Sequence, residues 1–368
     1  MIYVVGFFGA LLLGLVVTPL VIRLARHLGL LDVPAVAPHR KIHKKPMPLL
    51  GGSAIMFAFF FMTVLFMLHG DIFSGELGAL SRKAFWGIAF GAAFLLVGGF
   101  LDDKYDLRAR WKFVYPIAAT FSLIVGGIGV LFITNPFGGI FNLEQIRITL
   151  FSLDGIPYQL VLFADVFTFL WLMGSMFTTK FLDGMDGLVT GIGVIGAVVI
   201  FLLSLRPEVA QPELALLSAI FGGALLGFFP YNFYPARIFL GEGGSLFVGF
   251  ILGTLSILAG GKIATALLIL GLPILDVAWA IMRRLMAGRS PFSADRQHLH
   301  HRLLDSGLPH RTVVLFFYGL TLLFGFSTLF VRGAMKAAVL VILVFVMALL
   351  AYLAIRFENR KVNHKPHE

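Results

Sequence analysis

The sequence predicts an all-α protein that crosses a membrane about eleven times. Of its 368 residues, 59% are hydrophobic and only 13% are charged, and the mean hydropathy is +0.94. A soluble domain of this size does not have such a composition. Each apolar segment has about the 20 residues that a helix needs to span the hydrocarbon core. The segments are residues 3–22, 51–69, 84–101, 113–133, 159–178, 188–205, 214–233, 244–260, 263–282, 312–331 and 337–355.

The basic residues predict the orientation of these segments. With the N-terminus outside, 22 of the 29 Lys and Arg residues fall on the inner side. Because basic residues concentrate in cytoplasmic loops, we expect an external N-terminus, a cytoplasmic C-terminus and an odd number of spans. The apolar run after Met1 lacks the basic start and cleavage site of a signal peptide, so we expect it to be the first span.

We expect residues 1–368 to form a single transmembrane domain, because no flexible linker, low-complexity tract or internal repeat interrupts them. Residues 140–158 alternate in polarity and contain Asp154-Gly155, which predicts a small external β-hairpin over the bundle. The sequence has no cysteine, which excludes disulfides and thiolate metal sites. Its net charge of +10 lies in loops between spans, which favours membrane lipid headgroups and phosphate ligands over nucleic acid.

Five inner loops hold the candidate site residues, and the central one carries two carboxylates. The five are residues 23–50, 102–112, 179–187, 234–243 and 283–311. If the helix before the central turn continues through it, Asp183 and Asp186 share one face. Acids at the rim of a span are costly without a cation or a base nearby. The pair therefore predicts a magnesium-dependent site for a diphosphate at the cytoplasmic membrane surface.

Two adjacent acids begin the second inner loop, and a third follows four residues after the first. Asp102 and Asp103 follow a span that ends in two glycines, and Asp106 precedes Lys112. Carboxylates this close can divide the roles of base and metal ligand. The alternative is a helix cap neutralised by neighbouring Lys and Arg residues.

The first inner loop combines an acid with a basic run. Asp32 precedes the run that contains Arg40 and His43, and the loop ends in Gly51-Gly52. The histidine and the glycines favour a phosphate-facing loop. The alternative is a topology signal or a contact with lipid headgroups.

The fourth inner loop leads into a glycine-rich helix start. Gly241 opens a turn whose backbone N–H groups could face an anion. Glu242 would repel a bare phosphate, so a cation between them is expected. Asn232 precedes the loop, and Phe239 could stack on a base, with ordinary packing as the alternative.

The fifth inner loop holds three histidines in four positions, His298, His300 and His301, between Arg296 and Arg302. We favour diphosphate or nucleotide contact, with structural zinc as the alternative. On a helix, His298 and His301 would share a face and His300 would point elsewhere.

Two further acids lie within or at the ends of spans. Asp276 is near the inner end, where it could anchor Arg283 or Arg284. Asp165 lies toward the outer face and has no predicted role.

Together these motifs resemble a known family. Their order is Asp-Pro-Arg-Lys-His-Pro-Gly-Gly, Asp-Asp-x-x-Asp, Asp-Gly-x-Asp-Gly, Asn-x-x-Pro-Ala-x-x-Phe-x-Gly and His-x-His-His, over essentially residues 1–311. This order resembles the polyprenyl-phosphate N-acetylhexosamine-1-phosphate transferases of glycosyltransferase family 4, such as the undecaprenyl-phosphate GlcNAc-1-phosphate transferases. The His-x-His-His motif, and Asp106 where the muramoyl-pentapeptide branch has Lys, favour the simple amino-sugar branch.

The resemblance implies a bacterial multi-pass enzyme of the cytoplasmic (inner) membrane with its active site on the cytoplasmic face. A UDP-N-acetylhexosamine would give its sugar-1-phosphate to a polyprenyl phosphate such as undecaprenyl phosphate and release UMP. The product would be the first intermediate of a cell-surface polysaccharide. The implied cofactor is Mg²⁺, for which Mn²⁺ could substitute. The resemblance is also compatible with a homodimer, and it leaves open a one-step or a covalent two-step mechanism.

The resemblance also assigns roles to residues. Asp102 and Asp103 would deprotonate or orient the lipid phosphate, Asp183 and Asp186 would line the catalytic site, and Glu242, with Asp186, would hold the metal. The remaining candidates would bind substrate: Asp32, Arg40, His43, Asp106, Lys112, Lys180, Asn232, Phe239, Gly241, His298, His300, His301 and Arg302.

Three positions depart from the family pattern. The family usually has Asp at Glu242, Asn at Lys180 and Gln at Pro116. We therefore expect Lys180 and Glu242 to form a compensating pair, with Lys180 supplying charge to the diphosphate.

Three rival functions remain at this level. They are phospho-N-acetylmuramoyl-pentapeptide transfer, anion transport, and a catalytically inactive scaffold, which the changes at Lys180 and Glu242 keep open. A transporter should show inverted repeats and polar residues at mid-membrane, and the sequence shows neither.

Overall fold

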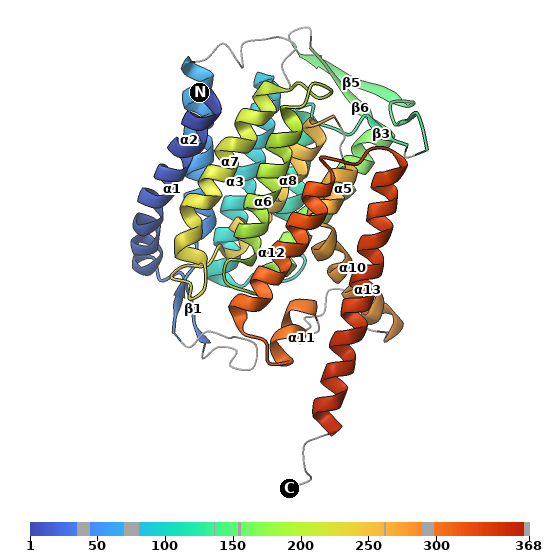
Figure 1. Ribbon diagram of the computed structural model, residues 1–368. Coiled ribbons are helices and arrows are strands. Elements are labelled where there is room, and N and C mark those ends of the chain that lie inside the picture. Colours follow the sequence, from blue (N-terminus) through green and yellow to red (C-terminus); the bar gives the residue numbers. More distant parts are fainter. Residues whose placement is uncertain are drawn as a thin grey trace.

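The computed structural model describes residues 1–34, 45–69, 81–135, 137–153, 156–260, 263–288 and 298–363. It is a bundle of long helices with short antiparallel strands at its two ends (Figure 1). The helices are α1 (Ile2–His27), α2 (Gly51–His69), α3 (Arg82–Tyr105), the 3₁₀ turn η3 (Trp111–Phe113), α4 (Val114–Val125), α5 (Leu162–Leu182), α6 (Leu188–Ser204), α7 (Pro212–Asn232), α8 (Gly241–Leu258), α9 (Ile263–Ile269), α10 (Gly271–Met286), α11 (Leu299–Asp305), α12 (His310–Ser327) and α13 (Ala334–Asn363).

The prediction of a multi-pass helical membrane protein is confirmed. In the described residues, eight helices are long and apolar enough to cross a membrane: α1, α2, α3, α5, α7, α8, α12 and α13. The helices α9 and α10 pass this test only as a pair, which is bent by 79°. The apolar helices at Trp111–Val125 and Leu188–Ser204 are shorter. The structure thus supports eight spans, or nine with the bent pair, and the count of eleven stays a prediction.

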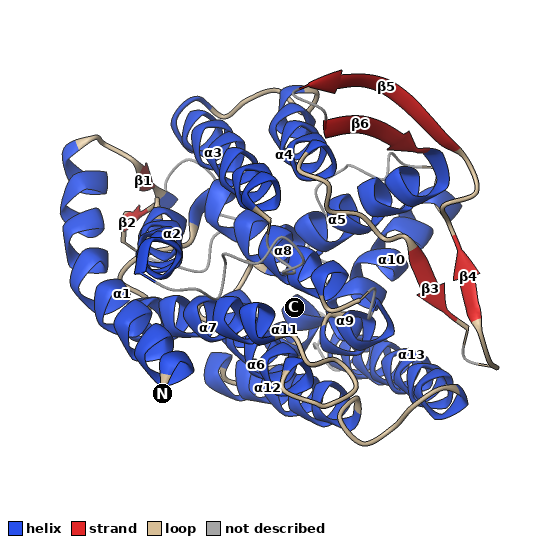
Figure 2. Cartoon of the chain, turned by 90° about the horizontal axis from the view of Figure 1, so that it is seen from above, coloured by secondary structure: helices blue, strands red, loops and turns tan. Residues whose placement is uncertain are grey.

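Helix α8 lies at the centre of the bundle, with α3, α5 and α7 around it (Figure 2). Its start is held by contacts between glycines. A Cβ atom added to Gly99 of α3 would overlap the backbone of Gly243, and one added to Gly52 of α2 would overlap the backbone of Gly244. Backbone atoms cannot rotate away as side chains can, so only glycine permits these approaches. The contacts fix the start of α8 against α2 and α3.

Short strands occupy the ends of the bundle. The pair β1 (Leu31–Asp32) and β2 (Met47–Pro48) lies at the same end as α11 (Figure 1). At the opposite end, β3 (Phe132–Thr134) pairs with β4 (Ile140–Asn142), and β5 (Arg147–Leu153) pairs with β6 (Ile156–Val161), each antiparallel. The predicted hairpin segment overlaps β4, β5 and β6. Its location on the external side stays a prediction.

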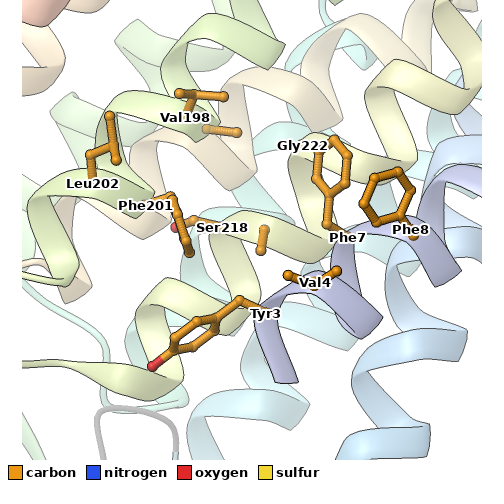
Figure 3. Close-up of a pocket in the computed structure, with 11 residues that line it drawn as sticks. Tyr3, Val4, Phe7, Phe8, Val198, Phe201, Leu202, Ser218 and Gly222 are labelled. Carbon is orange, nitrogen blue, oxygen red and sulfur yellow. The ribbon is translucent and has the colours of Figure 1, made fainter. Parts of the chain in front are cut away.

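The start of α1 and the end of α13 lie at opposite ends of the bundle, which is the arrangement that an odd number of spans gives (Figure 1). A cavity of about 300 Å³ lies between α1, α6 and α7 and is lined mainly by apolar side chains such as Tyr3, Phe7 and Phe201 (Figure 3). None of the predicted site residues lines this cavity, so the candidate site lies elsewhere.

Candidate active site

The end of α3 brings three predicted site residues together. The Nζ atom of Lys112 lies 3.0 Å from Asp102 Oδ1 and 2.9 Å from Asp106 Oδ1. The buried Asp102 also accepts a hydrogen bond of 2.8 Å from the Leu107 N–H. These are the contacts of the helix-cap alternative, with a lysine neutralising the acids. Direct participation of Asp102 in catalysis stays a prediction.

The carboxylate of Asp103 lies against the start of α8. The Glu242 N–H points at both of its oxygens, at 3.1 and 3.2 Å. Gly241 has a φ of 75°, and a Cβ atom there would lie 2.6 Å from Asp103 Oδ2. The sequence predicted free N–H groups at this helix start for an anionic ligand. That prediction is wrong for the Glu242 N–H, because the Asp103 carboxylate already takes the favourable position at the helix N-terminus.

Glu242 joins α8 to α5 and α4. The Nζ atom of Lys180 forms an ion pair with Glu242 Oε1, and both side chains are mostly buried. The predicted pairing of these two residues is therefore confirmed. The Tyr115 hydroxyl donates to the same oxygen at 3.1 Å and lies 3.4 Å from Asp102 Oδ2. Lys180, Glu242 and Asp102 thus belong to one network.

Tyr115 is a residue of this site that the sequence analysis missed. Its ring fills the space beside Gly98, where a Cβ atom would overlap it. The glycine pair before Asp102 was the available signal, because a small residue there leaves room for a large neighbour. Which side chain fills that room depends on how α4 packs on α3.

The central turn does not continue α5. The helix ends at Leu182, Asp183 caps it, and α6 begins at Leu188, so the expectation of one shared helix face is wrong. Gly187, directly before α6, has a φ of 80°, and this left-handed conformation turns the chain into that helix. The Asp186 carboxylate accepts a hydrogen bond from the Ala236 N–H at 2.9 Å. Its backbone N–H donates to His310 Nε2 at 3.3 Å.

The acids of different helices act on one another electrostatically. Burial, followed by the charges of Glu242, Asp103 and Asp186, raises the pKa of Asp183 to about 8. Asp32 is also close enough to add to the negative potential at Asp103. Acidic groups from three inner loops and from the end of α3 therefore converge on one region. Such a region favours the binding of a cation.

The loop between α7 and α8 is held by Asn232. This buried side chain accepts a hydrogen bond from the Thr190 hydroxyl at 2.7 Å and donates to the Ile238 carbonyl at 3.0 Å. The backbone of Phe239 pairs with Pro48 and Gly51, at 2.9 Å in each case. Asn232 thus positions the loop, and nucleotide contact by Asn232 or Phe239 stays a prediction.

The histidine motif lies at the start of α11. His298 precedes this helix in extended conformation, so the expected sharing of one face by His298 and His301 is wrong. The His298 and His300 rings are 5.7 Å apart and nearly parallel, and the His300 and His301 rings are 4.2 Å apart. Burial, with the neighbouring histidines, lowers the pKa of His300 well below its usual value. The buried His300 ring therefore favours its neutral form.

The histidine motif contacts the central turn. A Cβ atom at Gly184 would lie 2.8 Å from His300 Nε2 and 3.3 Å from His301 Nε2. The absence of a side chain at Gly184 thus lets the motif approach Asp183 and Asp186. Arg302 follows on the same short helix. Arg40, His43 and Arg296 lie outside the described residues.

Among the described residues, no three His, Asp or Glu side chains are close enough to hold a metal ion, which leaves the zinc alternative without a ligand set there. Magnesium makes a different demand, because it is commonly held by one or two carboxylates together with substrate phosphates. The hard oxygen donors of Asp186 and Glu242 fit that requirement.

The chain is similar to known proteins along most of its length. The model of glycosyl transferase family 4 matches residues 85–260. The chain is 34% identical to a protein of Bacillus subtilis (strain 168) named probable undecaprenyl-phosphate N-acetylglucosaminyl 1-phosphate transferase, over 95% of this chain and 91% of that protein. It is 32% identical to the decaprenyl-phosphate N-acetylglucosaminephosphotransferase of Mycolicibacterium smegmatis (strain ATCC 700084 / mc(2)155), over 85% and 80% of the two chains.

A more distant relative shows the same relationship. The undecaprenyl-phosphate alpha-N-acetylglucosaminyl 1-phosphate transferase of Escherichia coli (strain K12) is 26% identical, over 78% of this chain and 73% of that protein. The similarity to the Bacillus subtilis protein extends over nearly the whole length of both chains. The residues that match the family model include the ends of α3, α5 and α7 and the start of α8. The chain is an enzyme that belongs to glycosyl transferase family 4.

Proposed function

We propose that this enzyme transfers N-acetylhexosamine 1-phosphate, in the first place GlcNAc 1-phosphate, from a UDP-sugar to undecaprenyl phosphate. The observation that carries the proposal is the convergence of Asp103, Asp183, Asp186 and Glu242 at one end of a membrane bundle. Relatives named as N-acetylglucosamine-phosphate transferases on polyprenyl phosphates support the choice of sugar and acceptor. They favour it over transfer of a muramoyl-pentapeptide.

In the proposed reaction, an oxygen of the acceptor phosphate forms a bond to the phosphorus that carries the sugar. The bond from that phosphorus to the oxygen of the departing UMP breaks, and a lipid diphosphate-sugar remains. Glu242 and Asp186 would hold Mg²⁺ or Mn²⁺, which when bound neutralises charge on the diphosphate.

The chain's own residues supply the remaining functions. Asp103 is fixed by the start of α8 and would orient the acceptor phosphate or accept its proton. Lys180 lies beside Glu242 and would add positive charge next to the diphosphate. The histidine motif, in contact with Gly184, would bind the sugar nucleotide.

A lipid acceptor requires a site that opens onto the membrane surface. Helix α10 is strongly two-sided: Trp279, Met282 and Met286 are exposed, whereas Asp276 and Arg284 are buried. Such a helix suits the boundary between lipid and water. The charge bias of the loops supports a site on the cytoplasmic side. The relatives from Bacillus subtilis and Escherichia coli favour the cytoplasmic (inner) membrane of a bacterium. The product would start a cell-surface polysaccharide.

The test is UMP release by the purified full-length enzyme with undecaprenyl phosphate. UDP-GlcNAc, UDP-GalNAc and UDP-muramoyl-pentapeptide are compared, each during a magnesium titration. We expect release with an N-acetylhexosamine donor, strict dependence on divalent cation, and loss of release in Asp183→Asn. Release only with the muramoyl donor, absence of release with all three, or full turnover in excess EDTA would contradict the proposal.

A further inference from the structure

Asp276 on α10 contacts the histidine motif, which lies 22 residues further along the chain. Its Oδ2 atom is 3.0 Å from His298 Nδ1, and its Oδ1 atom accepts a hydrogen bond of 2.8 Å from the Leu299 N–H. The residue is only 4% exposed. The sequence suggested Arg283 or Arg284 as partners of Asp276. In the structure both carboxylate oxygens contact the histidine motif, and pairing with Arg283 or Arg284 stays a prediction.

These contacts determine which nitrogen of His298 carries a proton. An ionised carboxylate can only accept hydrogen bonds, so the His298 Nδ1 must be the donor. In the neutral ring the Nε2 atom then has no proton and can accept a hydrogen bond. The second contact holds the Leu299 N–H at the start of α11. Asp276 thus constrains both the tautomer of His298 and the place where α11 begins.

The surroundings limit the movement of the ring. Phe181, just before the central turn, stacks on His298 with ring centroids 6.1 Å apart and planes 20° apart. The His300 ring, which itself contacts Gly184, also stacks on His298. Asp276 shares the inward face of α10 with Ala280 and Arg284, which are also buried. His298 is therefore held between α10 and the segment that carries Asp183.

We propose that Asp276 is a positioning residue that holds His298 with its proton on Nδ1, leaving Nε2 to accept a hydrogen bond from the sugar nucleotide. The partner on the substrate would be a hydroxyl or amide N–H group, since phosphate oxygens cannot donate. That the histidine motif binds the UDP-sugar rests on the proposed function. A wrong tautomer would present an N–H where the substrate needs an acceptor.

The first test is a double-mutant cycle in the full-length enzyme, assayed by UMP release. The side-chain oxygen of Asn at position 276 can still accept a hydrogen bond from the Leu299 N–H. Its NH₂ group then faces His298 Nδ1 and donates to it, which favours the tautomer with the proton on Nε2. We expect Asp276→Asn to raise the KM for UDP-GlcNAc about tenfold to hundredfold, the range seen for carboxylates behind metal-bound histidines. The KM for undecaprenyl phosphate should stay unchanged.

The cycle decides whether Asp276 acts through His298. Adding Asp276→Asn to His298→Gln should raise the KM for UDP-GlcNAc little further, because the imidazole ring that Asp276 positions is already gone. Asp165→Asn is the matched control, since it removes another helix carboxylate that accepts from a backbone N–H, at 2.8 Å. Losses that multiply in the double variant, or an equal KM change in Asp165→Asn, would overturn the proposal.

A second measurement needs neither turnover nor a folded variant at position 276. Nitrogen-15 NMR of histidine-labelled wild-type enzyme at pH 8 reports the tautomer of each ring, and His298→Gln identifies the signal. We expect a protonated Nδ1 and a bare Nε2, and the opposite tautomer would overturn the proposal. If the wild type releases no UMP, the proposed function fails, whereas this spectrum still decides the role of Asp276.

Discussion

Lys180 at the end of α5 and Glu242 at the start of α8 form an ion pair. The positive charge of Lys180 balances the negative charge of Glu242. Close packing of the two helices makes the pair possible: Gly249 of α8 lies directly against the backbone at Ser175 of α5. Tyr115 shares the same oxygen of Glu242. Lys180, Glu242 and Tyr115 thus form one connected group.

Changes at Lys180 and Glu242 should therefore not act independently of each other. In Lys180→Asn, Glu242 loses its counter-charge among other acids, and in Glu242→Asp the shorter side chain retreats from Lys180. We expect each single change to lower kcat/KM for UMP release about tenfold. In the double variant, kcat/KM should fall by less than the product of the two single losses, which corresponds to a coupling energy of about 1 kcal/mol or more.

The surface pair Arg332–Glu208 provides the control for this cycle. Exposed ion pairs contribute little, so Glu208→Gln should leave turnover unchanged. Strictly additive effects of Lys180→Asn and Glu242→Asp would show that the two residues act independently.

Gly184 should be sensitive to the addition of a single methyl group. In Gly184→Ala the new Cβ atom would meet His300 Nε2 at 2.8 Å, so the buried histidine must shift away from the central turn. We expect at least a tenfold loss of kcat/KM for UDP-GlcNAc with little change in thermal stability. Gly174→Ala is the matched control in α5, because nothing lies within 4 Å of its Cβ position. Equal activity of the two variants would argue against contact between the motif and the turn.

The raised pKa of Asp183 predicts a pH-dependent cost to stability. With a pKa of about 8, the folded enzyme keeps a proton that the unfolded chain, with its ordinary pKa of 3.8, has already lost. Stability from this group is therefore fully present below pH 3.8 and is lost as the pH rises through 8. Asp183→Asn removes this titration and, in excess EDTA, should stabilise the enzyme at pH 8 by on the order of 2 kcal/mol.

Thermal unfolding of the detergent-solubilised enzyme checks this result at two pH values. The increase in melting temperature that Asp183→Asn causes should be clearly smaller at pH 5 than at pH 8, while UMP release is lost at both pH values. The same increase in melting temperature at both pH values would mean that ionisation of the Asp183 carboxylate does not destabilise the folded enzyme.

The glycine contacts at the start of α8 should be needed for folding. In Gly99→Ala the added methyl group overlaps the backbone of Gly243, which forces α3 and α8 apart. Overpacking of this kind costs about 2 kcal/mol or more, so we expect a lower melting temperature and weaker UMP release. Gly319→Ala in α12 has open space around its Cβ position and should melt like the wild type. Equal melting of both variants would contradict the close approach.

Much of the helical architecture could be predicted, because hydrophobicity belongs to each residue wherever the chain takes it. All of the eleven apolar segments contain helix in the structure, including the bent pair α9 and α10. The limits of this reasoning appear at the helix ends. Periodicity did not show that α5 stops at Leu182 or that α11 starts after His298. The start of α11 depends on a contact distant in sequence, because the Leu299 N–H donates to Asp276 of α10.

The chemistry of the site divides in the same way. The sequence by itself determined which acids, lysines and histidines are available, and even that Lys180 and Glu242 should compensate each other. Only the tertiary structure decided that Tyr115 bridges Asp102 and Glu242, and that Asp276 reaches His298. The physical reason is distance: hydrogen bonds form over about 3 Å. Such approaches depend on where helices bend and on which glycines let their backbones meet.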